Sequence, residues 1–307
     1  MSDGHGRKAL KTAVGAASMA LCTVMATAGA VGDPNIQIPG ADDGLPNCAV
    51  LNINAFAGYI GTGEPRPTKA MDENFATAPV GDWCNTNVGY SSTSYGPDGV
   101  TFVNPPTRDG LFPYNNSEVL SKPVFEPGQT MTIDIKGAPD LTTHNGTAGW
   151  GVSNRSIDPL GLEIAWFMYN GSHGFLGDAS ELTRPVFNVL GQDLPRGFFL
   201  MVKRGGELVP QITPLDPALL SDDHAYAVRL TDQRVEFFID GAPVGTFASP
   251  PHGKGVNILQ KPVPLLGQAW LDGSYWFPLP IPEYNDREQR LTMTRYRQGP
   301  SETTALR

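Results

Sequence analysis

The side chains most capable of chemistry lie in three short segments that are far apart in the chain. The first holds Glu163 between Leu162 and Ile164. The others run from Tyr169 to Phe175 and from Trp270 to Phe277. Burial between apolar neighbours favours the neutral form of a carboxyl group, which can then act as a general acid. Glu163 is therefore the best single catalytic candidate, and a structural carboxylate held by an arginine or a backbone donor is the alternative.

The other two segments combine aromatic rings with groups that hydrogen-bond to hydroxyls. The apolar faces of sugar rings pack on indole and phenol rings, and carboxylate, imidazole and amide groups bind sugar hydroxyls. A solvated histidine and a hydrophobic staple between loops are the competing interpretations. We predict that six of these side chains contact a ligand: Tyr169, His173, Trp270, Asp272, Tyr275 and Trp276.

No segment has the spacing of a calcium loop, and no Cys/His pattern suits zinc. The sequence therefore predicts no metal and no cofactor. A structural calcium bound by loop carbonyl oxygens would leave no such pattern, so that alternative stays open.

The first thirty residues have the composition of a secretory signal peptide. Arg7, Lys8 and Lys11 precede a stretch of small and apolar residues from Thr12 to Ala30, which ends in two Ala-x-Ala sites. A membrane anchor is the alternative. We predict cleavage near Ala30 and a secreted or extracytoplasmic chain. Cys48 and Cys84 then remain as an even pair in an oxidising compartment, which predicts a disulfide between them.

Charge and hydropathy exclude some classes of partner. The formal net charge is -9, and lysine and arginine are scattered after the signal peptide, so we predict no nucleic-acid partner. No later apolar run reaches the length needed to span a membrane. The oligomeric state is not indicated.

The 35 glycines and 28 prolines are spread along the chain and interrupt any long helix. Several segments alternate apolar and polar residues, as in Thr130 to Lys136, and His224 to Leu230 pairs naturally with Arg234 to Asp240 as a hairpin. Pro217 to Asp223 is either a single helical turn capped by Asp216 or loop. These patterns predict an all-β antiparallel sandwich at 71–298, after an N-terminal arm at 31–70 and before a tail at 299–307.

Ten strands are predicted from these patterns. They are Gly99 to Val103, Glu118 to Phe125, Thr130 to Lys136, Leu162 to Tyr169, Gly197 to Lys203, His224 to Leu230, Arg234 to Asp240, Val244 to Phe247, Val256 to Leu266 and Arg290 to Arg297.

Two stretches resemble laminarinase-like glycoside hydrolases of family 16, in the concanavalin A-like superfamily. Ser117 to Phe125, followed by Gly128 and Met131 to Lys136, is similar to the paired strands before their active-site strand. The His-x-Tyr strand from His224, followed by Phe237 to Gly241, is similar to their later hairpin. The resemblance implies a concanavalin A-like jelly roll.

The catalytic pattern of that family is incomplete. Its active-site strand carries three acids at alternating positions, because alternate residues face the cleft. Glu163 matches the first position, but Ala165 and Phe167 occupy the next two. The resemblance therefore does not supply a double-displacement mechanism from this strand.

We predict a secreted jelly-roll protein that binds a polysaccharide or cell-surface glycan in a groove on its concave sheet. Two alternatives remain. One is a glycoside hydrolase or polysaccharide lyase that uses Glu163 with a non-standard partner. The other is a structural or adhesive surface module.

Overall fold

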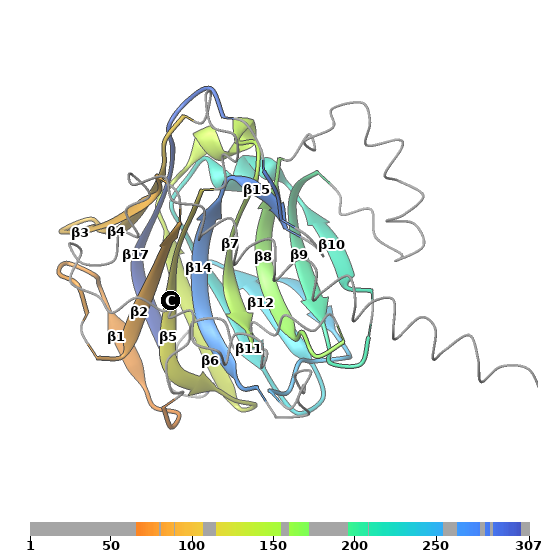
Figure 1. Cartoon of the computed structure of the whole chain (residues 1–307). Coiled ribbons are helices and arrows are strands. Elements are labelled where there is room, and N and C mark those ends of the chain that lie inside the picture. Colours follow the sequence, from red (N-terminus) through yellow and green to blue (C-terminus); the bar gives the residue numbers. More distant parts are fainter. Residues whose placement is uncertain are drawn as a thin grey trace, which may run out of the picture. The chain divides into compact units, whose positions relative to one another are not determined.

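The computed structural model describes residues 66–79, 81–88, 90–106, 115–154, 160–171, 196–207, 209–253, 263–276, 280–282 and 285–301. They form two antiparallel sheets that lie face to face (Figure 1). The predicted all-β antiparallel sandwich of the jelly-roll type is confirmed. Among these residues no helix is long and apolar enough to cross a membrane.

The eight-stranded sheet has the order β13-β12-β11-β6-β17-β4-β3, and β1 also pairs with β17. Its strands are β1 (Met71–Glu73), β3 (Ser92–Gly96), β4 (Gly99–Asn104), β6 (Gln129–Ile135), β11 (His224–Leu230), β12 (Val235–Ile239), β13 (Ala242–Phe247) and β17 (Gln289–Pro300).

The seven-stranded sheet has the order β10-β9-β8-β7-β14-β5-β2. Its strands are β2 (Trp83–Val88), β5 (Asn116–Phe125), β7 (Thr147–Ser153), β8 (Ile164–Asn170), β9 (Gly197–Lys203), β10 (Gln211–Leu215) and β14 (Leu265–Asp272). β15 (Ser274–Trp276) and β16 (Pro280–Pro282) form a separate ribbon.

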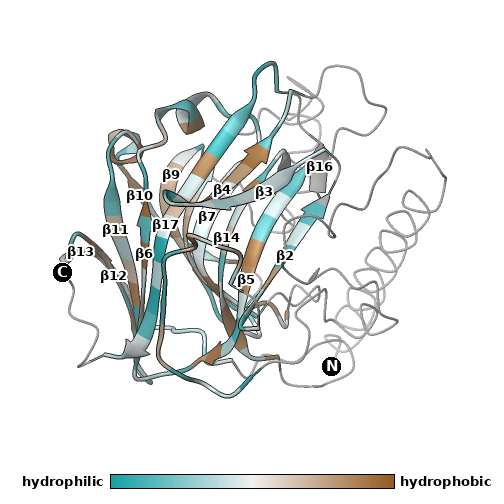
Figure 2. Ribbon diagram, turned by 90° about the vertical axis from the view of Figure 1, so that its left-hand side faces the viewer, coloured by the Kyte–Doolittle hydropathy of each residue, from teal (hydrophilic) through white to brown (hydrophobic). Residues whose placement is uncertain are grey.

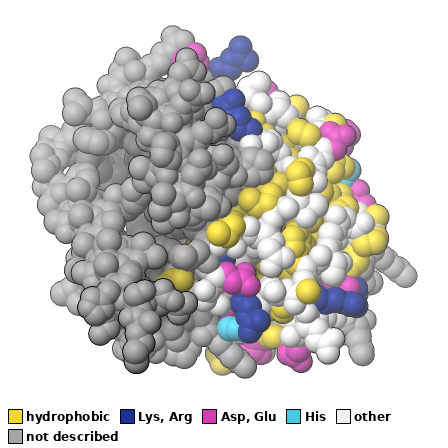
Figure 3. All heavy atoms as spheres, turned by 90° about the vertical axis from the view of Figure 1, so that its right-hand side faces the viewer, with side chains coloured by type: hydrophobic (Ala, Val, Ile, Leu, Met, Phe, Trp, Pro, Cys, Tyr) yellow, Lys and Arg dark blue, Asp and Glu magenta, His cyan; other side chains and the backbone are white. Residues whose placement is uncertain are grey.

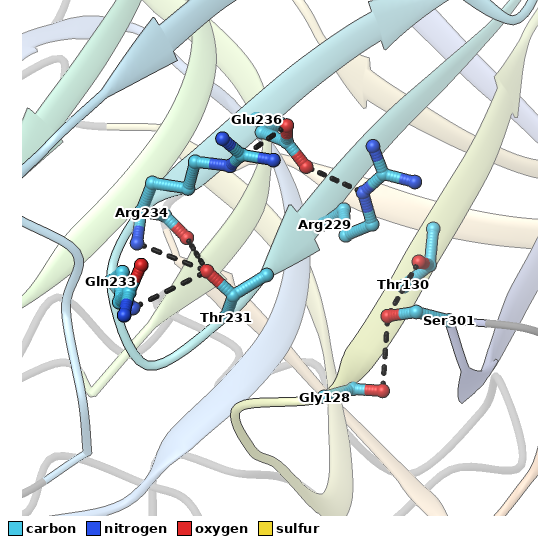
Figure 4. Close-up of polar contacts among 8 residues, drawn as sticks. All are labelled: Gly128, Thr130, Arg229, Thr231, Gln233, Arg234, Glu236 and Ser301. Atoms are coloured by element: carbon cyan, nitrogen blue, oxygen red, sulfur yellow. Dashed lines mark hydrogen bonds and ion pairs between the residues drawn. The ribbon is translucent and has the colours of Figure 1, made fainter.

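The predicted hairpin pairs β11 with β12, and its turn is closed by the Thr231 side chain. Thr231 Oγ1 accepts from the backbone N–H groups of Gln233 (3.3 Å) and Arg234 (3.0 Å). Figure 4 shows these bonds next to the Arg229–Glu236–Arg234 ion pairs on the outward side of the two strands. The short helical turn is also confirmed, because Asp216 Oδ1 accepts from Ala218 N at 2.9 Å ahead of the 3-10 turn Pro217–Leu220.

Some elements were not predicted. β7 (Thr147–Ser153) was not predicted because it contains two glycines. The strand predicted from Val256 lies largely outside the described residues, and the observed strand β14 begins only at Leu265.

Alternation along the strands builds the core between the sheets. In β6, Met131, Ile133 and Ile135 belong to the core, while Thr132 and Asp134 between them face away from it. Figure 2 shows apolar and polar residues mixed along the same strands, as expected when each strand has one core face and one outward face.

Phe167 lies at the centre of this core. Its ring meets Trp150, Phe198, Tyr226 and Phe237 at centroid distances of 6.4, 6.4, 5.0 and 5.2 Å. Because Tyr226 and Phe237 come from the eight-stranded sheet, this cluster holds the two sheets together.

The outermost strands β10 and β13 each contain a proline, Pro214 and Pro243. Proline lacks a backbone donor, which discourages further strand addition at these edges. Figure 3 shows the side of the molecule on the right of Figure 1, where the described surface mixes hydrophobic, acidic and basic side chains without a field of one sign.

Cys84 is 2% exposed in β2. Its predicted partner Cys48, the signal peptide and the N-terminal arm lie outside the described residues. The disulfide, the cleavage site and the domain boundaries stay predictions.

We predict that Phe167→Ala lowers the free energy of unfolding by about 3–5 kcal/mol, because it leaves a cavity between the sheets. Chemical denaturation of the purified chain measures this. Tyr90→Ala is the control, since Tyr90 is 69% exposed and its loss should cost less than about 0.5 kcal/mol. Equal effects of the two substitutions would contradict this account of the core.

Candidate functional site

The two faces of β8 carry different side chains. Ala165, Phe167 and Tyr169 belong to the core between the sheets. The residues between them, Ile164, Trp166 and Met168, belong to a second apolar cluster with residues of β9 and β14. This second cluster marks the face of the seven-stranded sheet that is turned away from the other sheet, which we call the outer face.

The sequence predicted that Glu163 stands in a groove on the concave sheet. In the structure its side chain does not lie on the outer face. It precedes β8, is 0% exposed, and shares its alternation with the core residues Ala165 and Phe167. The strand positions that face outward are apolar. The prediction was wrong because it placed the sequence motif on the strand one residue out of phase, and such a slip exchanges the two faces.

The Glu163 carboxylate is bound at the end of the sheet. Its Oε1 lies 3.0 Å from His252 Nδ1 and accepts from the backbone N–H groups of Gly205 (3.2 Å) and His252 (3.5 Å). Two backbone N–H groups and an imidazole therefore bind the carboxylate. The alternative from the sequence named an arginine or a backbone donor, and the structure has backbone donors.

A pair of indoles dominates the outer face. The rings of Trp166 and Trp270 meet at 4.8 Å between centroids, although β8 and β14 are not neighbours. β7 runs between them and places Gly151 opposite Trp166 and Gly149 opposite Trp270. A Cβ at Gly149 would lie 2.4 Å from the Trp270 ring, and one at Gly151 would lie 3.0 Å from that of Trp166. The glycines therefore make room for the two indoles above β7.

Polar side chains lie beside the indoles in β5 and β14. Register places Glu118 opposite Trp270, and Gln268 and Asp272 two residues on either side of Trp270 on the same face. All three are buried, with exposures of 2, 6 and 1%. The outer face is therefore apolar over β8 and β9 and polar over β5 and β14, with Trp270 at the boundary.

Several buried polar atoms of this face have no hydrogen-bond partner. They include the donor Nε1 of Trp166 and the acceptor Oε1 of Gln268, in side chains that are 4 and 6% exposed. Trp270 differs, because its Nε1 donates to Thr147 Oγ1 at 3.2 Å. Buried polar groups without partners cost free energy, and a hydroxyl could satisfy both this donor and this acceptor.

His144 lies at the end of the outer face. Its Nε2 is 3.0 Å from the backbone oxygen of Asp272. Burial lowers the pKa of His144 from 6.5 to about 4. The imidazole is therefore neutral at physiological pH and donates to that carbonyl.

The predicted ligand residues separate into groups. Trp270 and Asp272 share the outer face. Tyr169 lies on the opposite, core face of β8, where burial raises its pKa. Tyr275 and Trp276 form β15, of which the structure describes the backbone, and His173 lies outside the described residues.

Sequence reasoning missed Trp166, Gln268 and Glu118 as members of the site. The signal that would have found them is the alternation around Trp270, combined with the two glycines of β7. No set of three or more His, Cys, Asp or Glu side chains in the described part of the chain is placed to hold a metal ion.

No protein-family model matches the chain, and no curated protein matches it. Several solved structures are similar. A Crh5 transglycosylase is 15% identical, with 78% of this chain and 88% of that chain covered and a TM-score of 0.47. A Bacillus licheniformis β-glucanase is 14% identical over 75% and 97%, at 0.46. A prokaryotic β-1,3-1,4-glucanase (lichenase) derived from a mouse hindgut metagenome is 13% identical over 76% and 99%, at 0.47. At such identities and TM-scores these likenesses say nothing about the function of this chain.

We predict that the buried His144 makes the fold sensitive to acid. The unfolded chain takes up a proton below pH 6.5, whereas the folded one does so only near 4. The contribution of His144 is thus fully present above pH 6.5 and is lost as the pH falls to 4, by about 3 kcal/mol. Denaturation at several pH values measures this. His144→Gln should flatten the pH dependence in that window, and an unchanged slope would contradict the assignment.

Proposed function

We propose that this protein is a secreted glycan-binding protein whose ligand lies on the outer face of the seven-stranded sheet. The observation that carries the proposal is the Trp166–Trp270 pair next to a hydrogen-bond donor and an acceptor that have no partner. Indole faces bind the apolar faces of sugar rings, and the open polar atoms suit their hydroxyls. Secretion rests on the composition of the first thirty residues.

The outer face has an apolar half and a polar half, so we expect it to bind a sugar in one orientation. Its apolar half offers ring stacking at Trp166, and its polar half offers the carboxylates of Glu118 and Asp272. A sugar that stacks on the indoles would direct its hydroxyl edge toward β5 and β14. Because Trp166 and Trp270 are only 4 and 5% exposed, binding must uncover this face, which predicts slow association.

We predict that Trp166→Phe weakens glycan binding about five- to tenfold while the fold is kept, because it removes the indole N–H and retains an aromatic ring. Stability should fall only moderately, since the smaller ring leaves a cavity beside Trp270 while a buried donor without a partner disappears. A glycan array identifies an oligosaccharide, and calorimetry compares the variants on it.

The matched control is Trp150→Phe. Trp150 Nε1 is also buried without a hydrogen-bond partner, but this ring lies in the core between the sheets. It should leave the affinity unchanged. Equal losses in both variants, or an array without any binding, would refute the proposed site.

Hydrolysis at the same face is a second candidate, favoured by the placement of two acids. Glu118 lies opposite Trp270, and Asp272 lies two residues further along β14 on the same face. The backbone positions of such diagonal neighbours are about 7–8 Å apart, within reach of each other's side chains. Inverting hydrolysis needs carboxyl groups about 6.5–9.5 Å apart, one to protonate the leaving oxygen and the other to activate water, and we propose that this pair supplies them.

We predict for this candidate that Glu118→Gln abolishes release of reducing ends from the bound oligosaccharide while binding persists. Proton NMR of the first product should show an inverted anomeric centre. The control is Glu288→Gln, which changes an acid just before β17 of the eight-stranded sheet. Lack of reducing ends with the unaltered protein would eliminate hydrolysis and leave the binding proposal intact.

A further inference from the structure

One row of side chains crosses the outer face at Gly151. Register places Gln268 of β14 on one side of Gly151 and Trp166 of β8 on the other. A Cβ at Gly151 would lie 3.0 Å from Cδ1 of Trp166, the ring atom bonded to Nε1. The N–H edge of this indole therefore lies above the glycine. Directly opposite positions in a sheet have Cβ atoms about 4.5–5.5 Å apart, which brings Gln268 to the same place.

The space above Gly151 is bordered by one donor and one acceptor. Trp166 Nε1 can only donate and Gln268 Oε1 can only accept. Both atoms are buried without a hydrogen-bond partner, so they do not bond to each other. A ligand group that satisfies both must offer an acceptor toward β8 and a donor toward β14.

Apolar side chains close this row at both ends. Leu120 of β5 lies beside Gln268, and Met201 of β9 lies beside Trp166. Both are 0% exposed, as is Ile164, two residues before Trp166 on the same face. A ligand that brought additional hydroxyls into these surroundings would leave them without partners, which costs binding free energy.

We propose that this row binds the acetamido group of an N-acetylhexosamine. The amide oxygen of the sugar accepts from Trp166 Nε1, its N–H donates to Gln268 Oε1, and its methyl group packs on the apolar side chains of the row. Each polar atom then has one partner. A sugar hydroxyl has one donor and two acceptor sites on a single atom and no apolar end, so it matches the row less well. The inference rests on the proposed glycan site of the outer face and names the class of sugar that it takes.

The same row discriminates against the free amino sugar. A protonated amine has donors only, so it leaves Trp166 Nε1 without an acceptor. Its charge would also be buried between apolar side chains, which is costly. The expected order of affinity for the group at C2 of the sugar is therefore acetamido, then hydroxyl, then ammonium.

The test uses an array of matched oligosaccharides and the full chain. Each set fixes the linkage and the ring configuration and varies only the group at C2. Triacetylchitotriose, cellotriose and chitotriose form one set, and their β-1,3-linked and galacto counterparts form the others. Calorimetry on the set that binds best should show the acetamido sugar bound about 30-fold or more tighter than the hydroxyl sugar.

Two variants test the assignment of the contacts. Gln268→Met and Trp166→Phe should each lower the preference for the acetamido over the hydroxyl sugar about five- to tenfold. A residue that only supports the fold would lower all three affinities alike and leave this preference unchanged. If Gln268→Met does not fold, Trp166→Phe and the preference of the unaltered protein still decide the question.

The matched control is Gln289→Met. Gln289 lies in β17 of the other sheet, is 3% exposed, and its Oε1 also has no hydrogen-bond partner. This variant should keep the full preference. Equal or tighter binding of the hydroxyl or ammonium sugar, or a preference that neither test variant changes, would overturn the acetamido assignment while glycan binding stands. An array on which no set binds would reject glycan binding itself, and this inference with it.

Discussion

The packing of β8 on both of its faces is the constraint on which the rest of the structure depends. One face places Phe167 among rings from both sheets, and the other places Trp166 against Trp270. Sliding the strand by one residue would exchange these two sets. The register of β8 is therefore fixed from both sides, and with it the position of every side chain on the outer face.

The glycines of β7 allow the outer face to be built in this way. A side chain at Gly149 would occupy the space of the Trp270 ring, since its Cβ would lie 2.4 Å from that ring. Two indoles from strands that are not neighbours can therefore meet above the strand between them. The burial of these rings stabilises the sheet, while the polar atoms of Trp166 and Gln268 that have no hydrogen-bond partner lower its stability. Such a cost is common where a protein binds a ligand.

The sequence predicted much of the fold because its local signals agree with the final structure. The alternation in Met131 to Ile135, the hairpin around Thr231 and the cap at Asp216 all depend on neighbours in the chain. β7 was not predicted, because its glycines make room for indole rings of other strands. The sequence near β7 gives no sign of those rings.

The candidate site was predicted only in part, for a related reason. Trp270 and Asp272 were found from their residue types, but the side of the strand that each residue faces depends on long-range register. Glu163 has the residue type of a catalytic acid, yet its carboxylate is held by Gly205 and by His252, far along the chain. Residue types thus indicate a chemistry, and only the pairing of strands decides where it is placed.

Indole NMR tests the central claim most directly, namely that Trp166 presents its N–H to a ligand on the outer face. The chain has five tryptophans, so a spectrum of the ¹⁵N-labelled indoles resolves each of them, and the Trp166 signal is assigned by its absence in Trp166→Phe. On titration with a bound oligosaccharide, the account predicts a large shift of the Trp166 Nε1–H signal while Trp150 stays in place. Saturable binding with an unmoved Trp166 signal would contradict it.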